Sequence, residues 1–341
     1  MKYILILVLV ASIGVSLFFV SREHSVSYRK EENQNNETME SKPLLFVGDI
    51  MMGRFVETLG KRYGNESFMF ASTSDYLKRH VTIANLEGPI PNTHEPTPIN
   101  GFSFSFPSST PRILKENGIT AVSLANNHMF DHGRGAWEET KSALDQAGVA
   151  HVGGYAPTES DVFETSLGVQ KVVVYGITMI ATGWDESQTL LVTEKLRKDH
   201  PDALLIAFLH WGDEYVSQNE VQRSFAHKLI DRGVDAIVGS HPHVVQGIEL
   251  YDGKPIFYSL GNFVFDQYWM EGLEDGYALR LNGRTDSYEY DIVPIHSVRS
   301  VPSIADSVIR NSILSAIADQ SPETIRASIM EGKIRIPAPS H

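Results

Sequence analysis

The sequence predicts an α/β fold, because short apolar segments typical of strands alternate with amphipathic segments typical of helices. Local signals mark the ends of these elements: Pro111 begins one helix, and Gly233 follows another. The chain of 341 residues is 42% hydrophobic, enough for one large core or two small ones. Neither an internal repeat nor a second domain boundary is visible, so we predict one layered α/β domain over residues 44–341.

The predicted strands are short and end in glycine or polar residues. We expect them at Leu44–Val47, Val81–Ala84, Ala121–Leu124, Ala150–Val152, Ala203–Leu209, Val234–Val238 and Pro255–Leu260. Lys171–Ala181 is expected to form two β segments around Tyr175 and Gly176. Helices are expected at 55–60, 74–79, 110–118, 135–147 and 220–232. The last part of the chain is expected to form edge strands at Ala278–Leu281 and Tyr288–Val293, then helices at Ile304–Ile317 and Glu323–Glu331.

Composition narrows the classes of partner and of metal site. The chain carries 42 acidic and 29 basic residues, and its net charge of −13 argues against a nucleic-acid partner. It has no cysteine, which excludes disulfides, thiolate metal sites and the cysteine anchor of a bacterial lipoprotein. Any metal site must therefore be built from histidine, aspartate, glutamate or asparagine.

The N-terminal segment Tyr3–Val20 is continuously apolar, and its length is at the lower end for a helix that spans a bilayer. No convincing small-x-small cleavage site follows it, so we favour a transmembrane anchor over residues 1–21, with a cleaved signal peptide as the alternative. Residues 22–43 are polar and are expected to form a flexible stalk. We expect a single-pass protein of the cell membrane whose C-terminal domain is extracytoplasmic.

The stretch Gly239–Gly247 follows the apolar run Val234–Val238 and offers two histidines on one turn. His241 and His243 flank Pro242, whose fixed φ restricts the relative direction of the two imidazoles. Neutral imidazole is the commonest metal-binding side chain near pH 7, and ligands of open α/β sheets gather at the carboxyl ends of the strands. The two histidines are therefore candidate metal ligands; the alternative is a pair of surface histidines in a polar turn.

Other strand ends carry residues of the same kind: Asp49, Glu87, Asn127 with His128, and His210. Each has a structural alternative. Asp49 would then be a turn aspartate, Glu87 a buried glutamate held by backbone N–H groups, and Asn127 a left-handed turn asparagine. So many ligand-type residues at strand ends of one domain favour a shared metal centre.

Taken in order, these motifs resemble the calcineurin-like metallophosphoesterase superfamily, and more closely the CapA-type poly-γ-glutamate capsule proteins. The matching segments are Gly48-Asp49-Ile50-Met51-Met52-Gly53, Asn85-Leu86-Glu87-Gly88-Pro89, Asn126-Asn127-His128 with Asp131 and Gly133, His210-Trp211-Gly212, Gly239-Ser240-His241-Pro242-His243 and Gly261-Asn262-Phe263-Val264-Phe265-Asp266. The resemblance covers about residues 44–270. It implies a four-layer α/β/β/α sandwich of the metallophosphoesterase type.

The resemblance also implies roles for single residues. A divalent metal ion (Mn, Fe or Zn) would be held by Asp49, Glu87, Asn127, His210, His241 and His243. His128 resembles the histidine that protonates a leaving group or steadies a bound oxyanion. Asp131, one turn later, would orient it; the alternative for Asp131 is an ordinary aspartate at a helix N-terminus.

One position departs from the superfamily pattern. The first motif of the superfamily is Asp-x-His, and this chain has Met51 at the third position. Methionine is a soft, neutral and weak ligand, unsuited to Mn²⁺ or Mg²⁺. The first metal position therefore lacks an imidazole, which puts ordinary two-metal phosphoesterase chemistry in question.

Two functions follow as expectations. The first is a part in the biosynthesis or export of poly-γ-glutamate or a similar anionic polymer, together with other subunits of a membrane polymer synthase. The second is metal-dependent hydrolysis of a phosphoester, or of the polymer's amide, in the cell envelope. His128 favours the enzyme, whereas Met51 favours the accessory role.

Overall fold

A computed structural model describes residues 42–154, 156–284 and 286–337. These residues belong to one compact unit of the chain, Glu40–His341. The predicted anchor at 1–21 and nearly all of the predicted stalk at 22–43 lie outside the described residues. Within the described ranges, no helix has both the length and the apolar character needed to cross a bilayer.

The larger of the two sheets has nine strands and contains both ends of the described chain. Its strands are β1 (Leu44–Ile50), β2 (Val81–Leu86), β3 (Ile119–Ser123), β4 (Ala150–Val152), β11 (Asn262–Val264), β12 (Asp275–Gly283), β13 (Ser287–Val298), β14 (Val301–Ile304) and β15 (Lys333–Pro337). The order is β14-β13-β12-β1-β2-β3-β4, with β11 beside β1 and β15 beside β13. Strands β1 to β4 are parallel, so their carboxyl ends lie at one edge.

The smaller sheet has six strands. They are β5 (Val162–Leu167), β6 (Gln170–Thr178), β7 (Leu204–His210), β8 (Ala236–Ser240), β9 (Ile248–Tyr251) and β10 (Lys254–Phe257), in the order β5-β6-β7-β8-β10-β9. The central strands β6, β7, β8 and β10 are parallel, and the edge strands β5 and β9 are antiparallel to their neighbours. Because β6 to β8 are buried, they are apolar on both faces.

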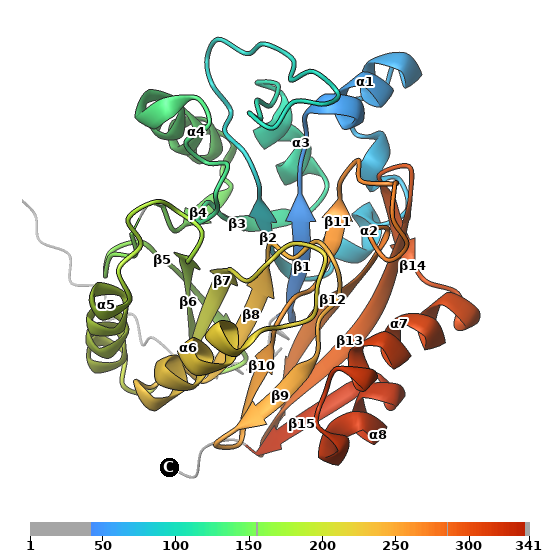
Figure 1. Ribbon diagram of the computed structural model, residues 1–341. Helices are drawn as coiled ribbons and strands as arrows, with labels where there is room; N and C mark the ends of the chain where they lie inside the picture. Colours follow the sequence, from blue (N-terminus) through green and yellow to red (C-terminus); the bar gives the residue numbers. More distant parts are fainter. Residues whose placement is uncertain (1–41, 155, 285, 338–341) are drawn as a thin grey trace, which may run out of the picture. The chain divides into compact units, whose positions relative to one another are not determined.

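The helices are α1 (Arg54–Tyr63), α2 (Ser74–Leu77), α3 (Thr110–Glu116), α4 (Gly133–Ala147), α5 (Glu186–Asp199), α6 (Glu220–Asp231), α7 (Ser307–Asp319) and α8 (Glu323–Glu331), with a 3₁₀ turn η1 at Phe68–Phe70. The two sheets pack face to face, and Phe46 of β1 meets Phe208 of β7 edge-on at 5.8 Å between ring centroids. Helices α1, α3 and α4 share an apolar cluster with the outer face of the larger sheet, and α5 and α6 with that of the smaller (Figure 1). The α/β prediction is confirmed, with helices outside two sheets.

Several predicted elements differ from the structure. Residues Lys171–Thr178 of the predicted Lys171–Ala181 belong to one strand, β6, and Gly176 does not break it. A Cβ at Gly176 would lie 3.0 Å from Ser123 Oγ and 3.1 Å from Gly153 Cα, so the glycine permits close packing. The predicted helix Ile304–Ile317 is divided, with β14 ending at Ile304 and α7 beginning after Asp306, which accepts from two backbone N–H groups.

Other elements were shortened or missed. The predicted strand Pro255–Leu260 ends at Phe257. Helix α5 and strands β5 and β9 have no counterpart in the predicted elements. The apolar residues of α5 are diluted by Thr189, Thr193 and charged side chains, so its helical periodicity is weak.

Candidate metal centre

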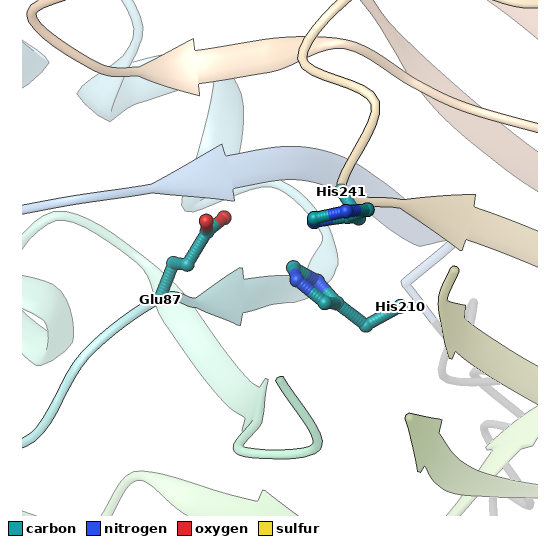
Figure 2. A group of neighbouring side chains, drawn as sticks. All are labelled: Glu87, His210 and His241. Carbon is teal, nitrogen blue, oxygen red and sulfur yellow. The ribbon is translucent and has the colours of Figure 1, made fainter. Parts of the chain in front are cut away.

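The parallel strands of the two sheets bring their carboxyl ends together at one place. Asp49 is the last residue but one of β1, and His210 is the last residue of β7. Glu87 directly follows β2, and His241 directly follows β8. The side chains of Glu87, His210 and His241 point toward one another (Figure 2). This is the edge at which ligands of open α/β sheets bind.

Three groups of side chains in the described ranges have ligand atoms within 4.8 Å of one another: Glu87–His210–His241, Asp49–Glu87–His243 and Glu214–His241–His243. The first two groups share Glu87 and contain only buried residues. Five of the six predicted metal ligands therefore lie in one cluster. The sixth, Asn127, touches it through its Oδ1, which lies 2.8 Å from His210 Nε2.

The His241–Pro242–His243 turn is held in an unusual backbone conformation. His241 has φ 95° and His243 has φ 61°, values that non-glycine residues rarely adopt. The rings of His210 and His241 lie 4.6 Å apart between centroids. Rare dihedrals of this kind persist only where the surrounding structure enforces them, and they concentrate at functional sites.

Asn85 organises the carboxylates, and the sequence analysis gave it no role. Its Nδ2 donates to Asp49 Oδ1 at 2.8 Å and to Glu87 Oε2 at 3.2 Å. Its Oδ1 accepts from Asn126 Nδ2 at 3.1 Å. Asn85 lies in β2 and Glu87 directly follows its last residue, so an extended backbone places the two side chains on the same side.

The hydrogen bonds around His210 determine which of its two ring nitrogens carries the hydrogen. The two amide hydrogens of Asn85 are used by Asp49 and Glu87, and the hydroxyl hydrogen of Ser240 is donated to Leu209 O at 3.0 Å. Nδ1 of His210, 3.2 Å from Ser240 Oγ, therefore carries the ring hydrogen and donates it to that oxygen. Nε2 is left with a lone pair that faces Asn127 Oδ1, itself an acceptor. A cation held by both atoms satisfies them together.

His243 is oriented in the same manner by a residue from the Gly261–Asn262 motif. Its Nδ1 lies 2.9 Å from Asn262 Oδ1 and 3.4 Å from Asp49 Oδ2, two acceptors that hold a hydrogen on Nδ1. His243 Nε2 lies 3.6 Å from Glu87 Oε1. Asn262 was quoted in the matching motif, but its contact with His243 was not predicted.

The electrostatics of the cluster favour the binding of a cation. Burial raises the pKa of Glu87; the nearby His243 opposes this shift, and the Asp49 carboxylate adds to it. Burial lowers the pKa of His243, but the Glu87 and Asp49 carboxylates outweigh it and raise that pKa to about 9. Both shifts arise because carboxylates are crowded in a buried space with little positive charge.

The remaining two imidazoles are suited to coordinate. Burial, with the neighbouring His243, lowers the pKa of His241 to about 4, and burial with His241 lowers that of His210 well below its usual value. Both rings are therefore neutral near pH 7, which metal binding requires. Glu87 Oε1 and His241 Nδ1 are buried without a hydrogen-bond partner among the described residues. Buried polar atoms are normally paired, so these two unpaired atoms fit a cation.

His128 and Asp131 form the predicted pair at the side of the cluster. His128 Nδ1 lies 2.8 Å from Asp131 Oδ2, and the imidazole stacks on Phe104 at 4.0 Å between centroids. Asp131 also accepts from Phe104 N at 2.6 Å, so its carboxylate is held from two sides. The pair leaves His128 Nε2 available for a proton transfer.

Met51 is fully buried in the apolar cluster between the larger sheet and its helices. Its Sδ accepts a hydrogen bond from Gly53 N at 3.1 Å. Trp211 packs on Tyr258 and its Nε1 donates to Tyr258 O at 2.8 Å. Glu214, a member of the third group, was not predicted because it lies in an exposed loop without a regular pattern.

The family model described as bacterial capsule synthesis protein PGA_cap matches residues 43–267. Capsule biosynthesis protein CapA of Bacillus anthracis is 32% identical over 332 residues, which cover 89% of this chain and 78% of that protein. PGA biosynthesis protein CapA of Bacillus subtilis is 29% identical over 301 residues, covering 81% of this chain and 77% of that protein. A probable polyglutamine synthesis accessory protein of Mycobacterium tuberculosis is 29% identical over 178 residues, covering 44% of this chain and 46% of that protein.

Proposed function

The chain belongs to the PGA_cap family of bacterial capsule synthesis proteins, and from this premise we propose that it acts in the biosynthesis or export of poly-γ-glutamate or a similar anionic surface polymer. The observation that carries the proposal is the ligand cluster at the joined strand ends, within the matched residues 43–267. The cluster's unpaired Glu87 Oε1 and His241 Nδ1 support a divalent cation.

The proposed ligands are Asp49, Glu87, Asn127, His210, His241 and His243, on a four-layer domain of the metallophosphoesterase type. Asn85, Ser240 and Asn262 hold four of them, Asp49, Glu87, His210 and His243, through the hydrogen bonds described above. A set of imidazole, carboxylate and amide groups suits Mn, Fe or Zn. The domain would be extracytoplasmic, carried on the segment 1–21 as a membrane anchor and on 22–43 as a stalk.

The bound cation would allow this acidic chain to bind an acidic polymer. A net charge of −13 repels an acidic polymer, so a bound divalent ion would supply the positive charge that a carboxylate of the polymer requires. In this role the chain works as a subunit of a membrane polymer synthase and holds the polymer.

A second candidate function, metal-dependent hydrolysis, is favoured by one observation: the His128–Asp131 pair beside the cluster. A bound ion would supply Lewis acidity and lower the pKa of a coordinated water. Asp131 fixes the hydrogen on His128 Nδ1, so that Nε2 can pass a proton to the oxygen or nitrogen of a leaving group. Phe104 covers one face of the imidazole and limits its motion.

Replacement of His243 and of His128 separates the two functions. We expect His243→Ala to lower the metal content of the full-length protein and to abolish polymer formation in cells that depend on this chain. His128→Ala should keep the metal; it abolishes polymer formation only if proton transfer is needed. A His243→Ala protein with unchanged metal content and unchanged polymer yield would contradict the proposal.

A further inference from the structure

Glu214 lies at the open side of the metal centre, four residues after His210. One of its carboxylate oxygens, one nitrogen of His241 and one nitrogen of His243 all lie within 4.8 Å of one another. The two buried groups described above meet the same criterion. Glu214 differs from their members because its side chain is exposed, so it stands where solvent reaches the cluster.

The backbone ties the loop of Glu214 to the turn that carries the two histidines. Tyr215 N donates to Pro242 O at 2.9 Å, between His241 and His243. Tyr215 has φ 66°, so left-handed residues occur on both sides of this hydrogen bond. Such conformations in two turns that contact each other indicate that the surrounding structure fixes both.

A chain of hydrogen bonds also connects the two sides through their side chains. His243 Nδ1 donates to Asn262 Oδ1 at 2.9 Å, and Asn262 Nδ2 donates to Gln267 Oε1 at 3.0 Å. Gln267 Nε2 donates to the Tyr215 hydroxyl at 3.2 Å. Outer partners of this kind orient metal ligands.

We infer that Glu214 is a ligand of the ion beside His243, a site to which Met51 brings no imidazole. This inference rests on the metal centre of the proposed function. Met51 Sδ accepts a hydrogen bond from Gly53 N, and Asp49, Glu87 and His243 make three protein ligands, which leaves at least one coordination position for a further ligand. Glu214 supplies a further one from the solvent side.

The exchange of an imidazole for a carboxylate changes the ion that the site prefers. A carboxylate brings a negative charge and a hard oxygen donor, which suit Mn²⁺ better than the softer Zn²⁺. With Asp49 and Glu87, it makes three carboxylates at the cluster. The position beside His243 should therefore favour Mn²⁺ more strongly than the position held by Glu87, His210 and His241.

The test is a calorimetric titration of the full-length, EDTA-stripped protein with Mn²⁺ and, separately, with Zn²⁺. Glu214→Gln keeps the size of the side chain but removes the charge, and it should weaken Mn²⁺ binding at one site by at least about tenfold, with a smaller loss for Zn²⁺. Glu220→Gln, an exposed glutamate whose side chain is 88% accessible in the following helix, is the matched control and should bind as the wild type does.

The outcomes distinguish this inference from the proposed function. If Glu214→Gln binds Mn²⁺ like the wild type whereas His243→Ala loses an ion, the metal centre stands and Glu214 is not a ligand. If Glu214→Gln binds Mn²⁺ and Zn²⁺ like the wild type but no longer supports polymer formation in cells, Glu214 acts on substrate, and the ligand assignment is again wrong. If the wild type binds neither ion, the metal centre itself is wrong.

Discussion

Glu289 connects the C-terminal strand to the larger sheet, and its replacement should destabilise the protein in a pH-dependent way. The carboxylate lies in β13, is 3% exposed, and accepts from Arg284 Nη2 and from Arg335 Nε, each at 2.8 Å. Lys333 Nζ lies 3.2 Å away. Arg335 and Lys333 belong to β15, so Glu289→Gln removes the negative charge that attracts these two side chains to β13.

The size of the effect follows from the pKa. The hydrogen bond from Arg284, with those from Arg335 and Lys333, outweighs burial and lowers the pKa of Glu289 from 4.5 to about 2. A difference of this size corresponds to about 3 kcal/mol at most. Arg284 and Arg335 are 55% and 65% exposed, so water screens the interaction, and we expect about 1–2 kcal/mol at pH 7.

The sign of the pH dependence is fixed by the direction of the shift. A carboxyl group whose pKa is lowered in the folded state stabilises that state at every pH above its pKa in the unfolded chain. This stabilisation is lost as the pH falls from that pKa toward the pKa in the folded state. The measurement is urea unfolding of wild type and Glu289→Gln between pH 7 and pH 3. Their difference in unfolding free energy should be constant down to about pH 4.5 and shrink below it.

A matched control is Glu271→Gln, an exposed glutamate between β11 and β12, which should have the wild-type unfolding free energy throughout. A Glu289→Gln protein as stable as the wild type at pH 7 would refute the reasoning. So would a difference that does not change with pH.

Three further predictions concern the centre and its scaffold. Asn262→Ala should lower metal affinity about 10–100-fold in an equilibrium titration, because His243 Nδ1 loses its acceptor; unchanged affinity would contradict the orienting role. Gly48→Ala should cost about 3 kcal/mol or more in chemical unfolding, because its Cβ would lie 1.8 Å from Gly261 O beside Asp49; a stable variant would show that the strands can separate there. Asn219→Ala should cost about 1 kcal/mol by loss of the capping box of α6 without any change in metal affinity, and a changed affinity would show that α6 positions the centre.

Much of the centre could be predicted because it depends on strand ends. The apolar runs before Asp49, Glu87, His210 and His241 are short and bounded by glycine or polar residues, so each run fixes where its strand stops. Parallel strands then bring these ends to one edge. The fold class rests on the same alternation. Element boundaries were less certain where a glycine such as Gly176 serves close packing and not a turn.

The residues that the sequence analysis missed act through partners that lie far away in the chain. Asn262 lies 19 residues from His243, and Gln267 lies 52 residues from Tyr215, so no local spacing connects them. Asn85 is different, because it stands only two residues before Glu87, a separation that puts two side chains on the same side of an extended backbone. Hydrogen bonding decides the role of such amides, and an amide can donate to a carboxylate only where the fold has brought the two together. The ligands of this centre could therefore be proposed from single motifs, whereas the groups that orient them required the packed structure of both sheets.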